Sequence, residues 1–265
     1  GTTKHFEGVP CGRSLFARQK EELRLAERVN ILGVDVDAVT MAEAVDVVRR
    51  AMDTRAGVMV ATANAEMLMR ATHDEELRRI LNASALVVPD GAGTVWAARH
   101  LGHAMPERVA GYDLAQELLR CAPAEGRRVY FFGSAPGVAE KAKAKAEQLY
   151  PGIEIVGVRN GFFSPADNAA IIAEIRAARP DLLLVALGVP KQEKWIAAHL
   201  AALDVPVAIG VGGTLDVMAG VMKRAPHWMQ RAKLEWLFRG LMQPKRAGRL
   251  LALPKFVLKV HASRK

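Results

Sequence analysis

The chain has 265 residues, of which 51% are apolar and 25% are charged, and its net charge is +9. This length and composition leave room for one large α/β domain, with or without a small appendage, and exclude wholesale disorder. Two cysteines, Cys11 and Cys121, are too few for a cysteine-built metal cluster or a disulfide framework, and no stretch approaches the roughly 20 apolar residues that cross a bilayer.

Short apolar runs recur along the chain, with amphipathic helical patterns between them. Several runs are nearly continuous Val, Leu, Ile or Phe, which is typical of strands buried on both faces. Strands that alternate with helices predict a mostly parallel sheet with helices on both faces. We expect strands over Ile31 to Val36, Val58 to Ala61, Ala85 to Val88, Val129 to Phe132, Ile153 to Val158, Leu182 to Leu187 and Val205 to Val211, and helices over Met41 to Met52, Glu140 to Leu149 and Asn168 to Ala178.

The chain divides into three predicted parts. Residues 1–28 are rich in charge and lack a strand pattern, so we expect a leader there that is helical or loose. Residues 29–223 hold the strands, and residues 224–265 form a basic helical appendage. Because ligands of parallel sheets bind outside the carboxyl ends of the strands, we look for the site in the segments that follow each strand.

Two glycine-rich segments each join a predicted strand to a helix. In the segment from Gly133 to Gly137, backbone N–H groups can point at an anion, although a tight turn explains the same residues. Neither a Walker A loop nor the dinucleotide Gly-x-Gly-x-x-Gly spacing is present there. Gly212 and Gly213 lie in the second segment, and Asp216 follows them closely enough to face a nucleotide base.

Polar side chains follow three other strands. Asp90 can act as a general base or cap a helix over Gly91 to His100. Thr62 and Asn64 project to the same side of an extended segment and suit sugar hydroxyls, or they begin the next helix. Gln192, in Lys191-Gln192-Glu193, lies in what is most simply the polar first turn of a helix.

Arg108 can face a diphosphate or lie in solvent.

Two further patterns are similar to metal-binding motifs. Asp35 and Asp37 match the Asp-x-Asp motif of metal-dependent sugar transferases, but they lie in an alternating strand, and we interpret them as polarity at its end. His100 and His103 flank a glycine at the expected end of a helix, with no other ligands nearby. We expect no metal site at either position.

The excess positive charge is confined to the tail. Residues 223–265 contain twelve Lys and Arg residues and one acid, whereas the remaining 222 residues carry a net charge of −2. Aromatic and basic residues alternate at helical spacing over 226–242, Pro244 ends that helix, and we expect Pro254 to interrupt the next one. Anionic lipid, nucleic acid and solvent are all compatible with this pattern.

Taken together, the ordered motifs from about Ile31 to Arg249 resemble the WecG/TagA/CpsF family of bacterial glycosyltransferases. The motifs that carry the resemblance are Thr62-x-Asn64-x-Glu66, Pro89-Asp90-Gly91, Arg108-Val-x-Gly111-x-Asp113, Phe132-Gly133-x-x-Pro136-Gly137, Gly188-x-Pro190-Lys191-Gln192-Glu193, Gly210-Val-Gly-Gly213-x-x-Asp216, Arg224-Ala-Pro226, Leu234-Glu-Trp236-Leu-Phe-Arg239 and Pro244-x-Arg246-x-x-Arg249.

The resemblance implies a Rossmann-like catalytic domain and an inverting, metal-independent transferase without a cofactor. The implied donor is a UDP-sugar of the N-acetylmannosamine type, and the implied acceptor is a sugar linked to undecaprenyl diphosphate. It also implies that the protein acts in the synthesis of cell-surface or wall polymers. The protein would lie at the cytoplasmic face of the bacterial inner membrane, held there peripherally by residues 224–265. Nucleic acid is not expected as a partner, and the oligomeric state is open.

By motif position, the resemblance implies a role for each candidate residue. Asp90 would be the base that deprotonates the acceptor hydroxyl. The positive charge facing the diphosphate and the leaving UDP would come from Arg108, Arg239, Arg246 and Arg249. The donor would lie against Thr62, Asn64, Gly133, Gln192, Gly212, Gly213 and Asp216.

Phe162 departs from the family pattern, because relatives often have Tyr there, and this leaves the donor sugar less defined than the reaction. Two other hypotheses remain at this point. One is a nucleotide-dependent oxidoreductase on a similar fold, against which the missing dinucleotide motif argues. The other is a basic membrane- or nucleic-acid-binding module without activity, for which Asp90 would have no chemical role.

Overall fold

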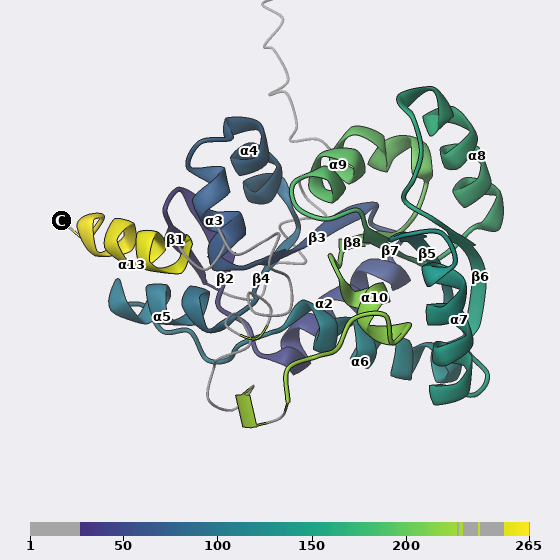
Figure 1. Ribbon diagram of the computed structural model, residues 1–265, viewed down its shortest axis with the longest axis horizontal. Helices are drawn as coiled ribbons and strands as arrows, with labels where there is room; N and C mark the ends of the chain where they lie inside the picture. Colours follow the sequence, from purple (N-terminus) through teal and green to yellow (C-terminus); the bar gives the residue numbers. More distant parts are fainter. Residues whose placement is uncertain (1–26, 227, 230–237, 239–251, 265) are drawn as a thin grey trace, which may run out of the picture.

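The computed structural model describes residues 27–226, 228, 229, 238 and 252–264, and it has the predicted α/β architecture (Figure 1). Six parallel strands form one sheet in the order β4-β3-β8-β7-β5-β6. Each of these strands overlaps one of the predicted apolar runs. They are β3 (Val58–Ala63), β4 (Leu86–Pro89), β5 (Arg128–Gly133), β6 (Glu154–Arg159), β7 (Leu182–Ala186) and β8 (Val207–Gly210).

Helices cover both faces of the sheet, as expected for parallel strands joined by crossovers. One face is covered by α2 (Met41–Asp53), α6 (Gly111–Glu125), α7 (Val138–Leu149) and α10 (Thr214–Met218). The other is covered by α3 (Ala65–Ala71), α4 (Glu75–Ala83), α8 (Asn168–Ala178) with the short η1 (Pro165–Asp167) before it, and α9 (Lys191–Leu203).

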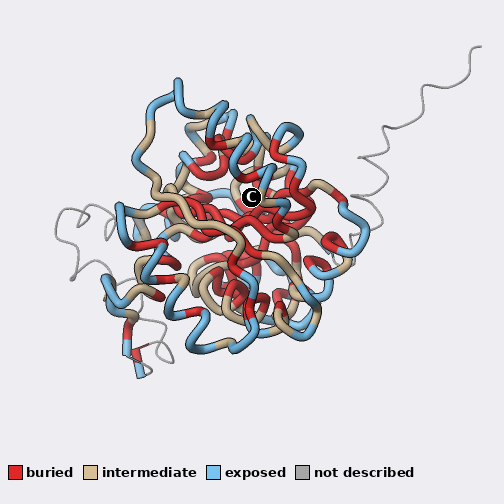
Figure 2. The backbone as a smooth tube through the Cα atoms, turned by 90° about the vertical axis from the view of Figure 1, so that its right-hand side faces the viewer, coloured by how far each residue is buried: buried red, intermediate tan, exposed pale blue. Residues whose placement is uncertain are grey.

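The core has two halves, one on each face of the sheet. Along β3, Val58 and Val60 point into the half that contains α2 and α6, whereas Met59 and Ala61 point into the half that contains α3 and α9. Figure 2 shows the strands as a buried band with exposed helix surfaces around it. Both strand faces are therefore apolar, which is why the sequence runs are nearly continuous.

The first predicted strand, Ile31 to Val36, is wrong as one continuous strand, because a turn divides it. The chain forms an antiparallel hairpin of β1 (Arg28–Ile31) and β2 (Val34–Asp37). Leu32 and Gly33 make the turn with φ of 54° and 89°, and two successive positive φ values are typical of tight hairpin turns. The glycine between two alternating apolar runs was the available signal for this turn.

Asp37 joins the hairpin to the sheet. Its buried carboxylate accepts hydrogen bonds from Arg28 Nε, at 2.9 Å, and from the backbone N–H of Val87, at 2.7 Å. Asp35 accepts from the Asn30 side chain at 2.7 Å. The interpretation of this Asp-x-Asp pair as part of a strand is confirmed.

The last described helix, α13 (Ala252–Ala262), packs on α3 and on α5 (Ala92–His100), as Figure 1 shows. Phe256 and Val260 are fully buried in that contact, and the rings of His100 and His261 meet at 3.1 Å between Nε2 and Nδ1. The expected break at Pro254 is wrong, because this proline lies in the first turn, where its missing N–H has no partner to lose.

No described helix is both long enough and apolar enough to cross a bilayer. The predicted helices around Arg239, Arg246 and Arg249 lie outside the described residues, and so does the leader up to residue 26. Within the predicted appendage of residues 224–265, α13 is therefore the helix whose packing on the catalytic domain can be described.

We expect Phe256→Ala to lower the free energy of unfolding by about 3–5 kcal/mol or to release α13, because it removes a fully buried ring. Thermal unfolding and limited proteolysis with mass spectrometry measure the two outcomes. Leu258→Ala on the same helix is the control, since Leu258 is 71% exposed. Equal effects of the two substitutions would contradict the observed orientation of α13.

Candidate active site

Backbone hydrogen bonds tie the segments after β4, β5 and β8 to the ends of neighbouring strands, at one edge of the sheet. The N–H of Asp90 donates to Ala63 O at 3.0 Å, which ties the end of β4 to β3. Across the sheet, the N–H of Ser134 donates to Ala186 O at 2.9 Å, and the N–H of Val211 donates to Val185 O at 2.9 Å. The sequence-predicted residues in the described part of the chain therefore collect along one edge.

Asp90 is not the N-cap residue of the helix that follows it. Gly91 occupies the N-cap position with φ of 97°, and α5 begins at Ala92. The alternative interpretation of Asp90 as the N-cap residue is therefore wrong. Asp90 is half-buried, and the backbone of the next residue lies close to the start of α3, since an added Cβ on Gly91 would be 3.9 Å from Asn64 Cβ.

Thr62 and Asn64 both have structural contacts. Asn64 Oδ1 accepts the Met67 N–H at 2.9 Å and caps α3, so the cap interpretation is confirmed for this residue. The buried Thr62 hydroxyl donates to Gly210 O at 3.2 Å and links β3 to β8. Each side chain keeps further capacity, because the Asn64 amide can donate and the Thr62 oxygen can accept.

Arg108 lies in a segment that is fixed on both sides. Next to it, Glu107 Oε2 accepts the Met41 N–H at 2.7 Å at the start of α2. On the other side, the N–H of Val109 donates to Pro89 O at 3.1 Å. The half-buried Arg108 is thereby placed on the segment that runs beside Asp90.

The Gly133 segment is a tight turn that also contacts α10. Gly133 has φ of 130°, and an added Cβ would be 2.4 Å from Ala186 O, so no other residue fits. The Ser134 hydroxyl is 3.2 Å from Asp216 Oδ2 and donates to it. The structure thus brings together Gly133 and Asp216, which sequence reasoning had proposed separately, and it adds Ser134.

Gln192 connects two of the loops. Its Oε1 accepts the N–H of Gly188 at 3.2 Å and the N–H of Gly212 at 3.0 Å. Its Nε2 donates to Glu193 Oε1 at 2.7 Å. The interpretation of these residues as the polar first turn of a helix is confirmed, because α9 begins at Lys191. This turn is buried, with Gln192 1% exposed and Glu193 fully buried.

Burial raises the pKa of the Glu193 carboxyl to about 7, while its hydrogen bond with Gln192 and the charge of Arg70 act in the opposite direction. Its second oxygen, Oε2, has no hydrogen-bond partner within the described chain. Sequence reasoning did not single out Glu193, because nothing in the local pattern distinguishes a buried first turn from a solvated one.

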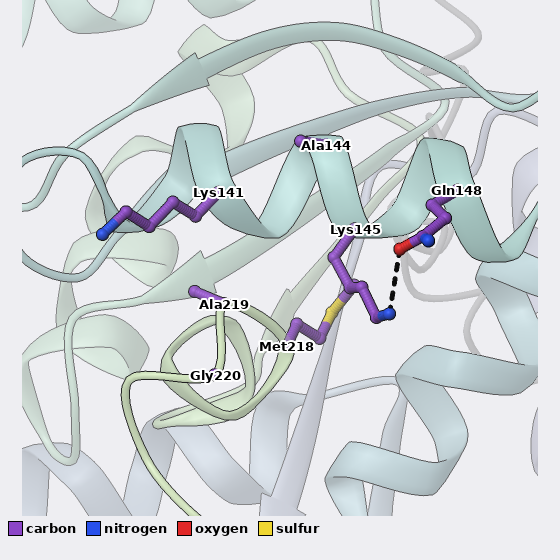
Figure 3. Close-up of a pocket in the computed structure, with 7 residues that line it drawn as sticks. All are labelled: Lys141, Ala144, Lys145, Gln148, Met218, Ala219 and Gly220. Atoms are coloured by element: carbon purple, nitrogen blue, oxygen red, sulfur yellow. Dashed lines mark hydrogen bonds between the residues drawn. The ribbon is translucent and has the colours of Figure 1, made fainter.

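A shallow hollow of about 470 Å³ lies between α7 and the end of α10, the helix that carries Asp216 (Figure 3). Lys141 and Lys145 extend from α7 at this hollow, and Lys145 Nζ donates to Gln148 Oε1 at 3.0 Å. None of the site residues proposed from the sequence lines it. The hollow therefore adjoins the candidate site but is separate from it.

Asp113 and Arg224 form a bidentate ion pair that sequence reasoning did not predict. The two guanidinium nitrogens are 2.7 and 2.9 Å from the two carboxylate oxygens, and the guanidinium lies 4.6 Å from the centre of the Tyr112 ring. The pair joins the start of α6 to the first residues of the basic tail. Both residues belong to motifs quoted above, but their separation of 111 positions concealed the contact.

Arg239, Arg246 and Arg249 lie outside the described residues, so their predicted roles stay predictions. Phe162 lies on the segment after β6 and is 74% exposed. Its neighbour Gly161 donates its N–H to Ser134 O at 2.8 Å, which places Phe162 near the Gly133 turn. In the described part of the chain, no three His, Cys, Asp or Glu side chains gather closely enough to hold a metal ion.

The model of the glycosyl transferase WecG/TagA/CpsF family matches residues 29–265. The chain belongs to this family. Two relatives bear the name N-acetylglucosaminyldiphosphoundecaprenol N-acetyl-beta-D-mannosaminyltransferase. The one from Staphylococcus aureus (strain MW2) is 34% identical over 242 residues, which cover 91% of this chain and 94% of the relative. The one from Bacillus subtilis (strain 168) is 36% identical over 209 residues, which cover 79% and 81%.

As a member of the WecG/TagA/CpsF family, the protein is a glycosyltransferase, which confirms the family resemblance and the transferase prediction. The oxidoreductase and the non-enzymatic binding module are thereby set aside. The strand-end residues described above are the candidates for the transfer reaction, and the assignment of a role to each of them is a proposal.

We expect Glu193→Gln to stabilise the protein more at pH 8 than at pH 5. The pKa of about 7 in the folded protein exceeds the ordinary value of 4.5, so the unfolded chain loses its proton first as the pH rises. The contribution of the protonated carboxyl to stability is therefore fully present below about pH 4.5 and is lost as the pH rises through about 7.

Melting temperatures of the wild type and Glu193→Gln at pH 5, 6, 7 and 8 test this expectation. Glu140→Gln, on the exposed surface of α7, controls for the general effect of removing one carboxylate. A difference between Glu193→Gln and the wild type that stays constant across this pH range would show that Glu193 does not titrate as expected.

Proposed function

We propose that this glycosyltransferase moves an N-acetylmannosamine-type sugar from UDP to a sugar on undecaprenyl diphosphate, with inversion at the anomeric carbon. The observation that carries the proposal is the placement of Asp90 directly after β4, where backbone hydrogen bonds hold it beside the end of β3 and the Arg108 segment. The names of the two relatives support this sugar and this acceptor. Polymer synthesis at the cell surface is the corresponding process.

Asp90 is the general base in this proposal. Its carboxylate takes the proton of the acceptor hydroxyl as that oxygen attacks the anomeric carbon. The bond from the anomeric carbon to the UDP oxygen breaks in the same step, and UDP leaves with the electron pair. Asn64 and Thr62, fixed by their contacts with Met67 and Gly210, hold sugar hydroxyls through their remaining donor and acceptor capacity.

The donor nucleotide lies along the loops after β5, β7 and β8. The bare backbones of Gly133, Gly212 and Gly213 let the diphosphate approach closely, and Asp216 faces the uracil. Gln192 acts there by holding the Gly188 and Gly212 backbones. The contact between Ser134 and Asp216 supports one continuous surface for the nucleotide.

Positive charge balances the leaving diphosphate, in a reaction that needs no metal ion or cofactor. Part of this positive charge comes from the catalytic domain, through Arg108. The rest comes from the basic tail, through Arg239, Arg246 and Arg249. Arginine suits this role because its planar guanidinium binds phosphate oxygens bidentately. Preorganised positive charge at the leaving group lowers the barrier most where negative charge grows.

Residues 224–265 seat the enzyme on the cytoplasmic face of the inner membrane, as a peripheral protein. The excess of positive charge in this segment supports that arrangement, since basic segments are attracted to anionic lipid. The Asp113–Arg224 ion pair fixes the start of the segment to α6. The tail arginines thereby reach the site where the lipid-linked acceptor is presented.

We expect Asp90→Asn to lower kcat by about 10²- to 10⁴-fold while UDP binding is unchanged, because the amide cannot accept the proton of the acceptor hydroxyl. Release of UDP from a panel of UDP-sugars, with and without a GlcNAc-diphosphate-lipid acceptor, measures the rate. Asp35→Asn is the control, since Asp35 lies in the β1–β2 hairpin. Full activity of Asp90→Asn would rule out Asp90 as the base.

We expect Arg246→Ala and Arg249→Ala each to lower kcat by about 10²-fold or more, as loss of one charge-stabilising donor commonly does. The same UDP-release assay, run on acceptor in vesicles, measures the effect. Arg264→Ala, an exposed position near the end of α13, controls for the loss of one positive charge from the tail. An equal loss in all three variants would indicate a general charge effect on membrane binding.

A further inference from the structure

Glu193 is a buried acid that the proposed reaction does not use. It occupies the first turn of α9, directly after Gln192, and no part of it reaches solvent. One carboxyl oxygen accepts from Gln192 Nε2 at 2.7 Å, and the other has no partner within the described chain. Keeping a carboxyl in this position costs free energy, because its lost hydration is only partly replaced.

The position of Glu193 is set by close backbone packing. An added Cβ on Gly210 would be 2.7 Å from Gln192 Nε2 and 3.0 Å from Glu193 Oε1, so the bare backbone of β8 lies directly against the two side chains. The carbonyl of the same glycine accepts from Thr62. The Gln192–Glu193 pair therefore packs against the end of β8, at the edge of the sheet where the Gly188 and Gly212 loops begin.

The orientation of the Gln192 amide decides whether the two loops have an acceptor. Gly188 and Gly212 each present an N–H to the same atom, so that atom must be the amide oxygen. A rotation of the amide by 180° would turn the NH2 group toward two donors, and both loops would lose their common partner. The acceptor at Glu193 favours the observed orientation, because it binds the NH2 group on the other side.

We propose that Glu193 is a positioning residue for donor binding, which holds the Gln192 amide so that it joins the Gly188 and Gly212 loops into one nucleotide-binding surface. Glu193 acts through Gln192 and has no contact with substrate. This inference rests on the proposed function, because it assumes that these loops hold the UDP part of the donor. Removal of the acceptor at position 193 weakens donor binding and leaves the chemical step unchanged.

The test is calorimetric titration of UDP into the wild type, Glu193→Gln, Glu193→Ala and Glu193→Leu. Glutamine keeps an acceptor oxygen and should bind UDP with near wild-type affinity. Alanine and leucine remove the acceptor, and we expect each to weaken UDP binding about tenfold, the effect of one lost hydrogen bond of ordinary strength. In steady-state assays the donor KM should rise by the same factor while kcat is retained.

Glu193→Leu separates positioning from stability. Leucine fills most of the volume and removes a buried carboxyl, so its melting temperature should be at or above that of Glu193→Ala, while its UDP affinity falls equally. Ser84→Ala is the matched control: Ser84 is buried and donates to Ile80 O at 3.0 Å, at the opposite edge of the sheet, and its loss should leave UDP affinity unchanged.

Three results would overturn the inference. They are wild-type UDP affinity in both Glu193→Ala and Glu193→Leu, a loss in Glu193→Gln as large as that in Glu193→Ala, and a fall in kcat at unchanged donor KM. A wild-type protein that neither binds UDP nor uses any UDP-sugar would instead overturn the proposed function. The two failures are therefore distinguishable.

Discussion

Hydrogen bonds between the parallel strands β3, β8, β7 and β5 hold four strand ends side by side at one edge of the sheet. Parallel strands all point the same way, so each crossover helix must begin at that edge. The loops that lead into α3, α7, α9 and α10 consequently meet there, although as much as 152 positions separate Asn64 from Asp216 in the sequence. Every residue proposed to hold the donor depends on this pairing.

Few side chains are needed to join the loops once the strands are paired. Thr62 bonds to the β8 backbone, Gln192 bonds to the loops after β7 and β8, and Ser134 reaches α10. Glycine makes these contacts possible, because a Cβ at Gly210 or Gly133 would collide with its neighbours. The result is a set of loops whose backbone and polar side chains have positions that are set before any ligand arrives.

The two parts of the chain differ in charge, which agrees with the different partners proposed for them. A nearly neutral body can bind a soluble donor, whereas a tail with a net charge of +11 suits an anionic membrane that holds the acceptor. Phe256 and Val260 bury one side of α13 in the body, and Arg224 binds Asp113 near the start of the tail. The described ends of the appendage are thus both joined to the catalytic domain, in keeping with tail arginines that act at its site.

The sequence by itself determined the architecture and the reaction class. Continuous apolar runs identified all six sheet strands, since burial on both faces leaves no place for polar residues. The ordered motifs identified the family, because many weak motifs in a fixed order seldom recur by chance. The hairpin at Leu32–Gly33 and the helix through Pro254 were missed, as both depend on backbone conformation at single positions.

Only the tertiary structure decided which polar residues are buried and what they contact. Asn64 is the N-cap residue of α3, whereas Gly91 and not Asp90 is the N-cap residue of α5, although Asn64 and Asp90 are both polar residues that follow a strand. Gln192 and Glu193 lie in the first turn of a helix, and the sequence pattern does not show that this turn is buried. The contacts Asp113–Arg224 and Ser134–Asp216 join residues far apart in the sequence, so no local pattern predicts them. The physical reason is that secondary structure follows from local patterns, whereas the partner of a side chain depends on segments that only the folded chain brings together.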